Sequence, residues 1–184
     1  MSLAIESIEA LDAASADDFA AAVAPLFEGA PSFLGRLADA RPFGTWEALF
    51  ERAREIAHEM PESEQMELVD AHPRLGAPPA EVSKLSFGEQ GYDRDLAATL
   101  AADEARERDR LVTELERLNR AYEAQFGFRY CVFVAGRSRS ELLPGMANAL
   151  ARERDSELHR ALDAVVDIAI DRQRHLAQSE GPRD

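Results

Sequence analysis

Apolar residues recur at the spacing of an α-helix in one segment after another, and this periodicity constrains the fold more than any other feature. Between Thr45 and Pro61 the apolar stripe consists of Trp46, Leu49, Phe50, Ala53, Ile56 and Met60. Thr45 can cap this helix and Pro61 would end it. A long charged segment carries a second such stripe in Leu111, Leu115, Leu118 and Tyr122. Gly127 would end that helix.

Helix start signals divide the rest of the chain in the same way. Serine is a common N-cap, and several serines precede apolar residues that recur at helical spacing. They predict further helices that start at Ser15, Ser63, Ser86 and Ser140. The first of these would close at Gly29 and Pro31, and a short helix would follow with Phe33, Leu34 and Leu37. The helix from Ser86 would run past Leu96 and Leu100. The last helix would carry Leu158, Leu162, Val165, Ala169 and Leu176.

One run, Tyr130 to Gly136, is β-branched and aromatic in the manner of a strand. It is isolated and would have no ladder partner, so it is interpreted as a buried extended or helical connector. We see no internal repeat and no interdomain linker. The sequence therefore predicts an all-α fold, a single-domain compact bundle of roughly eight or nine helices over residues 1–184. Its core would span about 19–176, with a frayed polar tail after Gln178.

Charge and composition exclude several classes of partner. The net charge of −14 argues against nucleic acid or an anionic membrane as partner. The single cysteine, Cys131, excludes an internal disulfide and a cysteine-based zinc site. No apolar run approaches the length of a membrane span. The N-terminus lacks the basic start and apolar run of a signal peptide, so we expect a cytoplasmic protein.

The segment from His72 to Gly76, followed by Ser86 to Gln90, offers the most compact candidate catalytic pair. His72 can act as an acid or base near neutral pH, and Glu89 can orient it or share a proton with a substrate. Structural alternatives exist for both. The His72 ring could cap the preceding helix, and Ser86-x-x-Glu89 matches a capping box.

The other histidines offer weaker candidates. His58 lies on a charged helix face and is predicted to be exposed, and His159 and His175 are predicted to lie on the surface of the last helix. Glu55-x-x-His58 has the spacing of di-iron helical bundles, but such sites need a second pair, and the sequence contains none. We therefore expect no metal site.

The chain resembles the 2-oxo-4-hydroxy-4-carboxy-5-ureidoimidazoline (OHCU) decarboxylases of urate breakdown in three blocks of sequence. These are Asp70-Ala71-His72-Pro73-Arg74-Leu75-Gly76, Ser86-x-x-Glu89-Gln90, and Leu118-Asn119-x-x-Tyr122-x-x-x-Phe126-Gly127-Phe128. The resemblance spans most of the chain, from Phe19 to Leu176. It implies an all-helical, cofactor-free carboxy-lyase, commonly dimeric, that converts its small-molecule substrate to (S)-allantoin with loss of carbon dioxide.

The same resemblance implies roles for individual residues. His72 would be the catalytic acid/base, acting at the substrate hydroxyl or at the carbon that is protonated. Glu89 would orient the substrate and share in proton transfer. Three side chains would line the pocket: Pro73, Ser86 and Gln90. Backbone groups of three consecutive residues would bind the amide edge of the ring: Phe133, Val134 and Ala135.

Two departures from the family pattern bear on substrate choice. The loop between His72 and Ser86 is shorter than in the characterised enzymes. The family's substrate-holding arginine aligns with Ala135, and Arg137 is the predicted substitute. Arg137 could also be solvated, and Arg139 could pair with Glu141.

Three hypotheses therefore remain open. The first is an OHCU decarboxylase. The second is a related enzyme that retains His72 and Glu89 but acts on another small ureido or hydroxy-acid compound, read through the altered Ala135 segment. The third is a non-catalytic helical binding module.

Overall fold

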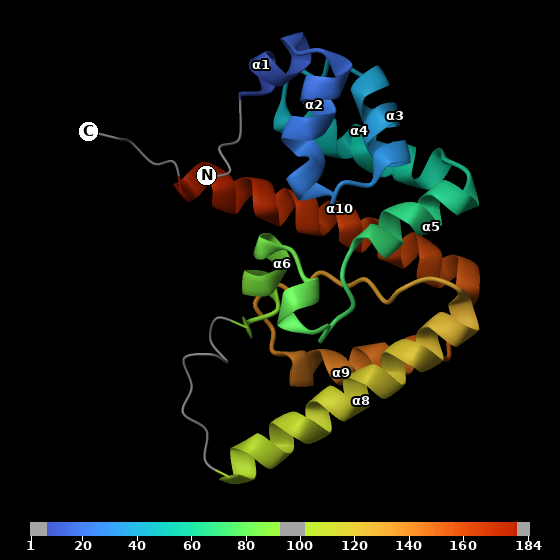
Figure 1. Cartoon of the computed structure of the whole chain (residues 1–184). Helices are drawn as coiled ribbons and strands as arrows, with labels where there is room; N and C mark the ends of the chain where they lie inside the picture. Colours follow the sequence, from blue (N-terminus) through green and yellow to red (C-terminus); the bar gives the residue numbers. More distant parts are fainter. Residues whose placement is uncertain (1–6, 93–101, 180–184) are drawn as a thin grey trace. The chain divides into compact units, whose positions relative to one another are not determined.

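The structure is a computed structural model that describes residues 7–92 and 102–179. In these residues it contains α-helices and short 3-10 turns and no strand, which confirms the prediction of an all-α fold (Figure 1). The chain divides into two compact units, Met1–His72 with Leu162–Asp184, and Pro73–Ala161. The prediction of a single domain over the whole chain stays a prediction.

The first unit consists of short helices and the C-terminal part of the last helix. Its elements are α1 (Ile8–Ala13), α2 (Ala16–Val23), η1 (Ala24–Leu26), α3 (Pro31–Asp39), α4 (Trp46–Glu59), α5 (Glu62–Ala71) and the part of α10 (Arg154–Ser179) that begins at Leu162. Helix α2 packs on α3, which also contacts α4 and α5 (Figure 1). The core of this unit is aromatic and aliphatic, with Phe19, Phe27, Phe33, Leu37, Leu49 and Leu68 fully buried.

Two of the predicted helix starts in this unit are confirmed. The Ser15 hydroxyl accepts from the Asp18 N–H at 3.1 Å, and the Thr45 hydroxyl accepts from the Ala48 N–H at 3.1 Å. Two other boundaries differ. Pro31 does not end a helix but opens α3, because a proline at the first helical position loses no hydrogen bond. Helix α5 starts at Glu62 with Pro61 as its N-cap, rather than at Ser63.

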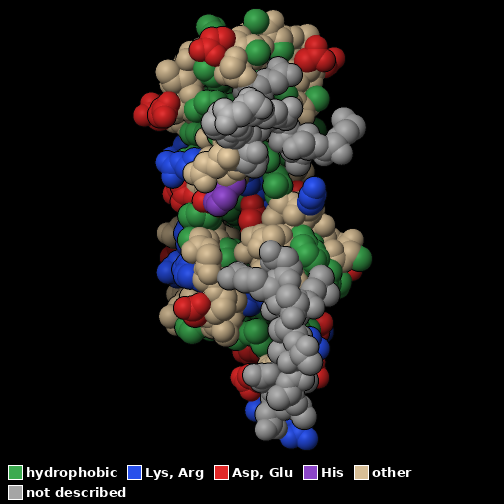
Figure 2. Space-filling view, turned by 90° about the vertical axis from the view of Figure 1, so that its left-hand side faces the viewer, with side chains coloured by type: hydrophobic (Ala, Val, Ile, Leu, Met, Phe, Trp, Pro, Cys, Tyr) green, Lys and Arg blue, Asp and Glu red, His purple; other side chains and the backbone are tan. Residues whose placement is uncertain are grey.

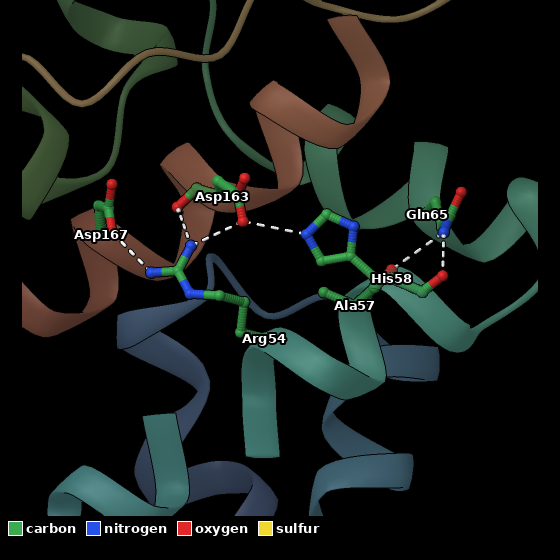
Figure 3. A network of polar contacts seen from close by, with 6 residues as sticks. All are labelled: Arg54, Ala57, His58, Gln65, Asp163 and Asp167. Atoms are coloured by element: carbon green, nitrogen blue, oxygen red, sulfur yellow. Dashed lines mark hydrogen bonds and ion pairs between the residues drawn. The ribbon is translucent and has the colours of Figure 1, made fainter. Parts of the chain in front are cut away.

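Polar contacts join α4 to α10 within the first unit (Figure 3). Arg54 donates to Asp163 and Asp167, each at 2.7 Å, and His58 Nε2 lies 3.0 Å from the Asp163 carboxylate. The prediction that His58 is exposed is therefore wrong: it is half-buried and faces an acidic partner more than a hundred residues later in the sequence. Burial raises the pKa of Asp163, but hydrogen bonds from His58 and Arg54 outweigh it and lower that pKa overall. His159 and His175 are exposed, as predicted.

The second unit is built around one long helix. Its elements are η2 (Pro79–Glu81), α6 (Lys84–Glu89), α8 (Ala102–Phe126), α9 (Arg139–Ala149) and the start of α10. Helix α8 packs on α9 (Figure 1) and ends at Gly127, as predicted, where φ is 82°. On its buried face, Tyr122 contacts the rings of Phe126, Phe128 and Tyr130.

Both predicted helix starts in this unit are wrong by a few residues. The N-cap of α6 is Ser83, whose hydroxyl accepts from the Ser86 N–H at 3.2 Å. The N-cap of α9 is Ser138, which forms a complete capping box with Glu141, so Ser140 lies inside the helix. The prediction that this helix runs on past Leu96 and Leu100 is wrong, because α6 ends at Glu89 and Gly91 follows with a φ of 77°. Leu96 and Leu100 themselves lie outside the described residues.

The strand-like run from Tyr130 to Gly136, called the connector below, forms neither a helix nor a strand. No strand pairs with it in the described parts of the chain. Tyr130 and Cys131 are buried, whereas the next three residues are only half-buried. Two consecutive positive φ angles, 52° at Ala135 and 72° at Gly136, turn the chain toward α9. Of the two forms that the sequence left open for this connector, the helical one is wrong, and only the first part of the run is buried.

The surface view in Figure 2 shows acidic and basic side chains interspersed on one face, with scattered hydrophobic groups. Among the residues outside the masked segments, the one large hydrophobic side chain that is exposed is Val112. None of the described helices combines the length and hydropathy of a membrane span.

Gly76 provides a test of packing in the second unit. Its φ is +78°, and a Cβ built there would lie 2.8 Å from Leu115 Cδ1 on α8. Gly76→Ala should therefore combine backbone strain with a clash and lower the free energy of unfolding by about 2–5 kcal/mol. Gly44→Ala is the matched control, since Gly44 has a φ of +75° but open space around its Cβ position. Its cost should be only the backbone term of about 1–2 kcal/mol. Equal losses in urea unfolding would contradict the packing argument.

Candidate functional site

His72 ends α5 in a buried position. It is the C-cap residue, and its own N–H donates to the Val69 carbonyl at 3.1 Å. The residue is only 4% exposed. Ring atom Nδ1 lies 3.2 Å from the Leu68 carbonyl oxygen. Because a carbonyl can only accept, Nδ1 carries the hydrogen, and Nε2 is the basic nitrogen of the neutral ring. The ring thus also caps the helix, the structural alternative raised by the sequence.

Burial keeps this imidazole neutral. Together with the charge of Arg172, which acts in the same direction, burial lowers the pKa of His72 to about 4. Glu28 and the hydrogen bond to Leu68 act in the opposite direction but do not compensate. At neutral pH the ring is therefore uncharged, with its hydrogen on Nδ1 and no proton on Nε2.

Arg172 and Glu28 are components of this environment that sequence reasoning missed. Arg172 is 2% exposed, donates to Glu28 at 2.7 Å and to the Pro25 carbonyl at 2.9 Å. The sequence could have predicted that Arg172 is buried, because this residue falls on the apolar stripe of the last helix, between Ala169 and Leu176. None existed for Glu28, which adopts a left-handed conformation with a φ of 52° in the loop before α3.

In the second unit the structure brings together parts of all three sequence blocks. The Gln90 side chain accepts from the Gly76 N–H at 2.8 Å and donates to the Arg74 carbonyl at 3.3 Å. Asn119 on α8 donates to the Leu75 carbonyl at 2.9 Å. Two buried side-chain amides therefore hold the irregular segment that follows His72 and Pro73, whose backbone groups have no helix to pair with.

Glu89 is not part of a capping box. The N-cap of α6 is Ser83, and Glu89 is the last residue of that helix, at the opposite end. A carboxylate there meets the negative end of the helix dipole, so it gains nothing from the helix. Ser86, the other half of the supposed box, is buried at 3% exposure. The structural alternative for this pair is wrong, and the position of Glu89 calls for another explanation.

The connector contains the predicted ring-binding segment, and Arg137 directly follows it. The exposed Arg137 side chain folds back on it, with Nε donating to the Val134 carbonyl at 3.0 Å and Nη2 to the Phe133 carbonyl at 2.5 Å. Arg139 lies with its guanidinium carbon 4.4 Å from the Tyr92 ring centroid. Glu141, its expected partner, is instead engaged by Ser138.

Among the described residues, no group of three or more His, Cys, Asp or Glu side chains is arranged to hold a metal ion. His72 belongs to the first unit, and the other predicted site residues belong to the second. The association of His72 with Glu89 in one site stays a prediction.

Sequence comparison decides the family. The family model for OHCU decarboxylase matches residues 12–174. The chain belongs to the OHCU decarboxylase family. The match covers all three sequence blocks, and it also covers Glu28, Glu157 and Arg172.

Two relatives match along almost their whole length. The chain is 26% identical over 167 residues to the 2-oxo-4-hydroxy-4-carboxy-5-ureidoimidazoline decarboxylase of Haloferax volcanii, covering 91% of this chain and 92% of that protein. It is 25% identical over 182 residues to the protein of the same name from Halalkalicoccus jeotgali, covering 97% and 94%. It is also 25% identical to a uric acid degradation bifunctional protein of Bacillus sp. strain TB-90, of which it spans only 30%.

Two solved structures share the fold. An OHCU decarboxylase crystallised in the presence of (S)-allantoin superposes with a TM-score of 0.58 at 22% identity, covering 84% of this chain and 94% of that one. An (S)-allantoin synthase superposes with a TM-score of 0.62 at 16% identity, covering 93% of this chain and 54% of that one.

The neutral, buried state of His72 predicts a pH-dependent contribution to stability. In the unfolded chain its pKa would be about 6.5, whereas in the folded chain it is lowered to about 4. A base whose folded pKa is lowered stabilises the fold fully above the unfolded pKa and loses this contribution as pH falls toward the folded pKa. The stability difference between wild type and His72→Asn should therefore shrink between about pH 6.5 and pH 4. Urea unfolding of both proteins across this range measures it, and parallel pH curves would contradict the pKa assignment.

Proposed function

We propose that this chain catalyses the cofactor-independent decarboxylation of OHCU to (S)-allantoin, a carboxy-lyase step of urate breakdown. The observation that carries the proposal is the family match over residues 12–174, which includes every predicted site residue. The fold and the environment of His72 support it. We further propose a cytoplasmic homodimer, as the family resemblance implies.

The reaction needs positioning and proton transfer. The bond between the ring carbon and the carboxylate breaks, carbon dioxide leaves, and the electron pair passes into the adjacent carbon–nitrogen double bond of the ring. A proton is taken up at that nitrogen. The hydroxyl then loses its proton and becomes a carbonyl, while the neighbouring ring carbon gains one. The electron pair has a sink within the substrate, so a protein acid/base group suffices for the proton steps.

In this proposal His72 transfers the proton. A neutral ring with its hydrogen fixed on Nδ1 toward Leu68 offers Nε2 as a base of defined position. It would accept the hydroxyl proton and deliver it to the ring carbon. Glu89, which the helix does not use as a cap, would orient the substrate and share in the transfer.

The second unit would supply the remaining contacts. Pro73, Ser86 and Gln90 would line the pocket, with Gln90 already fixed by its two bonds to the Arg74–Gly76 segment. Backbone groups of Phe133 to Ala135 would bind the amide edge of the ring. Arg137 would supply the cation that an anionic substrate requires in a protein of net charge −14.

The proposal is tested with freshly generated OHCU, by following (S)-allantoin by circular dichroism against the spontaneous decay. We expect wild type to accelerate the reaction, and His72→Asn and Glu89→Gln each to lose about 10²-fold or more in kcat/KM, as for positioned acid/base groups. Glu89→Gln should keep the melting temperature, since Gln has the same shape and Glu89 is not part of a capping box. A wild-type rate equal to the spontaneous decay would refute the function, and near-normal activity in either variant would remove that residue from the mechanism.

Arg137 is tested by charge-conserving substitution. A guanidinium can hold a carboxylate or ring carbonyl through two parallel hydrogen bonds, which an ammonium cannot reproduce. We expect Arg137→Lys to raise KM about tenfold, while Arg139→Lys, which alters the contact with Tyr92, leaves KM within about twofold. The reverse result would assign the role to Arg139. If neither variant changes KM, the better hypothesis is that the enzyme acts on a different substrate, which the altered segment at Ala135 would recognise.

A further inference from the structure

The connector is held by guanidinium groups where a sheet would use a neighbouring strand. Its carbonyl oxygens need donors, because backbone outside helices and sheets has no regular hydrogen-bond partners. Arg137 supplies the donors for Phe133 and Val134. The Cys131 carbonyl instead accepts from Nη1 of Arg160, at 2.9 Å. Arg160 lies on α10, so this hydrogen bond joins the connector to a long helix. The hydrogen bonds from Arg137, in contrast, come from the residue that directly follows the connector.

Three contacts fix the Arg160 side chain at the same time. Besides its bond to Cys131, its Nε donates to the Glu157 carboxylate at 2.9 Å. The face of its guanidinium lies over the Tyr130 ring, with the carbon 5.0 Å from the centroid. The planar group thus uses one edge for the carboxylate, another for the connector and one face for an aromatic ring.

Glu157 holds Arg160 rigidly because the carboxylate is itself completely buried and fully engaged. It is 0% exposed and also accepts from the Tyr122 hydroxyl and from Nη1 of Arg152, each at 2.8 Å. Burial raises the pKa of Glu157, but the bond from Arg152 and the charge of Arg160 outweigh this, so the pKa is lowered and the carboxylate stays ionised. Side chains from α8 and α10 therefore meet at one fixed anion.

We propose that Arg160, held by Glu157, is a positioning residue that fixes the connector backbone so that the amide groups of Phe133 to Ala135 are aligned for the ring of the substrate. The inference rests on the proposed function, since the connector binds the ring only in that proposal. Arg160 touches the connector two residues before Phe133 and acts through the backbone, not on the substrate.

Arg152 provides a matched control. It binds the same carboxylate as Arg160, through the other oxygen of Glu157, but its side chain is 51% exposed. In the described parts of the chain its hydrogen bond goes to Glu157 and not to the connector. Loss of the Arg152 contact disturbs the buried carboxylate without releasing the connector. A comparison of the two arginines therefore separates positioning from general support of the charge cluster.

The experiment compares Arg160→Lys with Arg152→Lys, which both keep a positive charge near Glu157. Lysine lacks the planar group with donors on two edges that reaches Glu157 and Cys131 while its face lies on Tyr130. We expect Arg160→Lys to raise KM for OHCU about tenfold with kcat within about threefold. Backbone amide exchange across residues 130–137 should also become faster. Arg152→Lys should leave both KM and connector exchange near wild-type values.

Each outcome decides the inference. Equal effects of the two variants, or unchanged KM and exchange in Arg160→Lys, would overturn it. If wild type does not decarboxylate OHCU at all, the proposed function fails separately. The exchange comparison then still decides whether Arg160 fixes the connector. Arg160→Gln, which retains one hydrogen-bonding end, replaces Arg160→Lys if a melting scan shows that the lysine variant does not fold.

Discussion

Burial of His72, beside the buried ion pair of Arg172 and Glu28, is the constraint on which the candidate catalytic histidine depends. Arg172 is almost inaccessible to solvent and places a fixed cation in the environment that lowers the pKa of His72. Glu28 and two backbone carbonyls hold that cation in place. Removing one partner of a buried pair leaves the other uncompensated, at a cost of about 3–5 kcal/mol. The neutral imidazole is therefore a consequence of how the first unit folds, not only of the His-Pro sequence.

Periodicity predicted most of the fold, but it could not choose among neighbouring serines. The stripes from Trp46 to Met60 and from Leu111 to Tyr122 correctly gave α4 and α8, because burial of one helix face leaves a regular record in the sequence. Ser83 and Ser86 both precede the same set of apolar residues at helical spacing, and so do Ser138 and Ser140 in the later helix. Which serine caps depends on where the incoming chain leaves its extended conformation, and that is set by tertiary contacts.

The candidate site was predictable only in part, because sequence blocks identify residues but do not show what those residues contact. The resemblance identified Gln90 and Asn119 as members of sequence blocks, and the structure gives their physical task, which is to satisfy the backbone between Arg74 and Gly76. Helical geometry cannot serve that segment, so side-chain amides from other elements must. The burial of His58 could not be predicted from its own helix, because its partner Asp163 lies on α10 and comes near only in the folded protein (Figure 3).

The connector shows how an all-α protein can keep one non-helical segment rigid. Two arginines supply hydrogen bonds that a sheet would take from a second strand, and each guanidinium has donors to spare for more than one acceptor. The segment then ends at Ala135 in a left-handed conformation that disfavours any side chain with a Cβ. Arg137, two residues after the position of the family arginine, lies beside the connector's carbonyl groups. In the proposed function, one short stretch of chain would therefore combine a fixed backbone with the cation that the substrate needs.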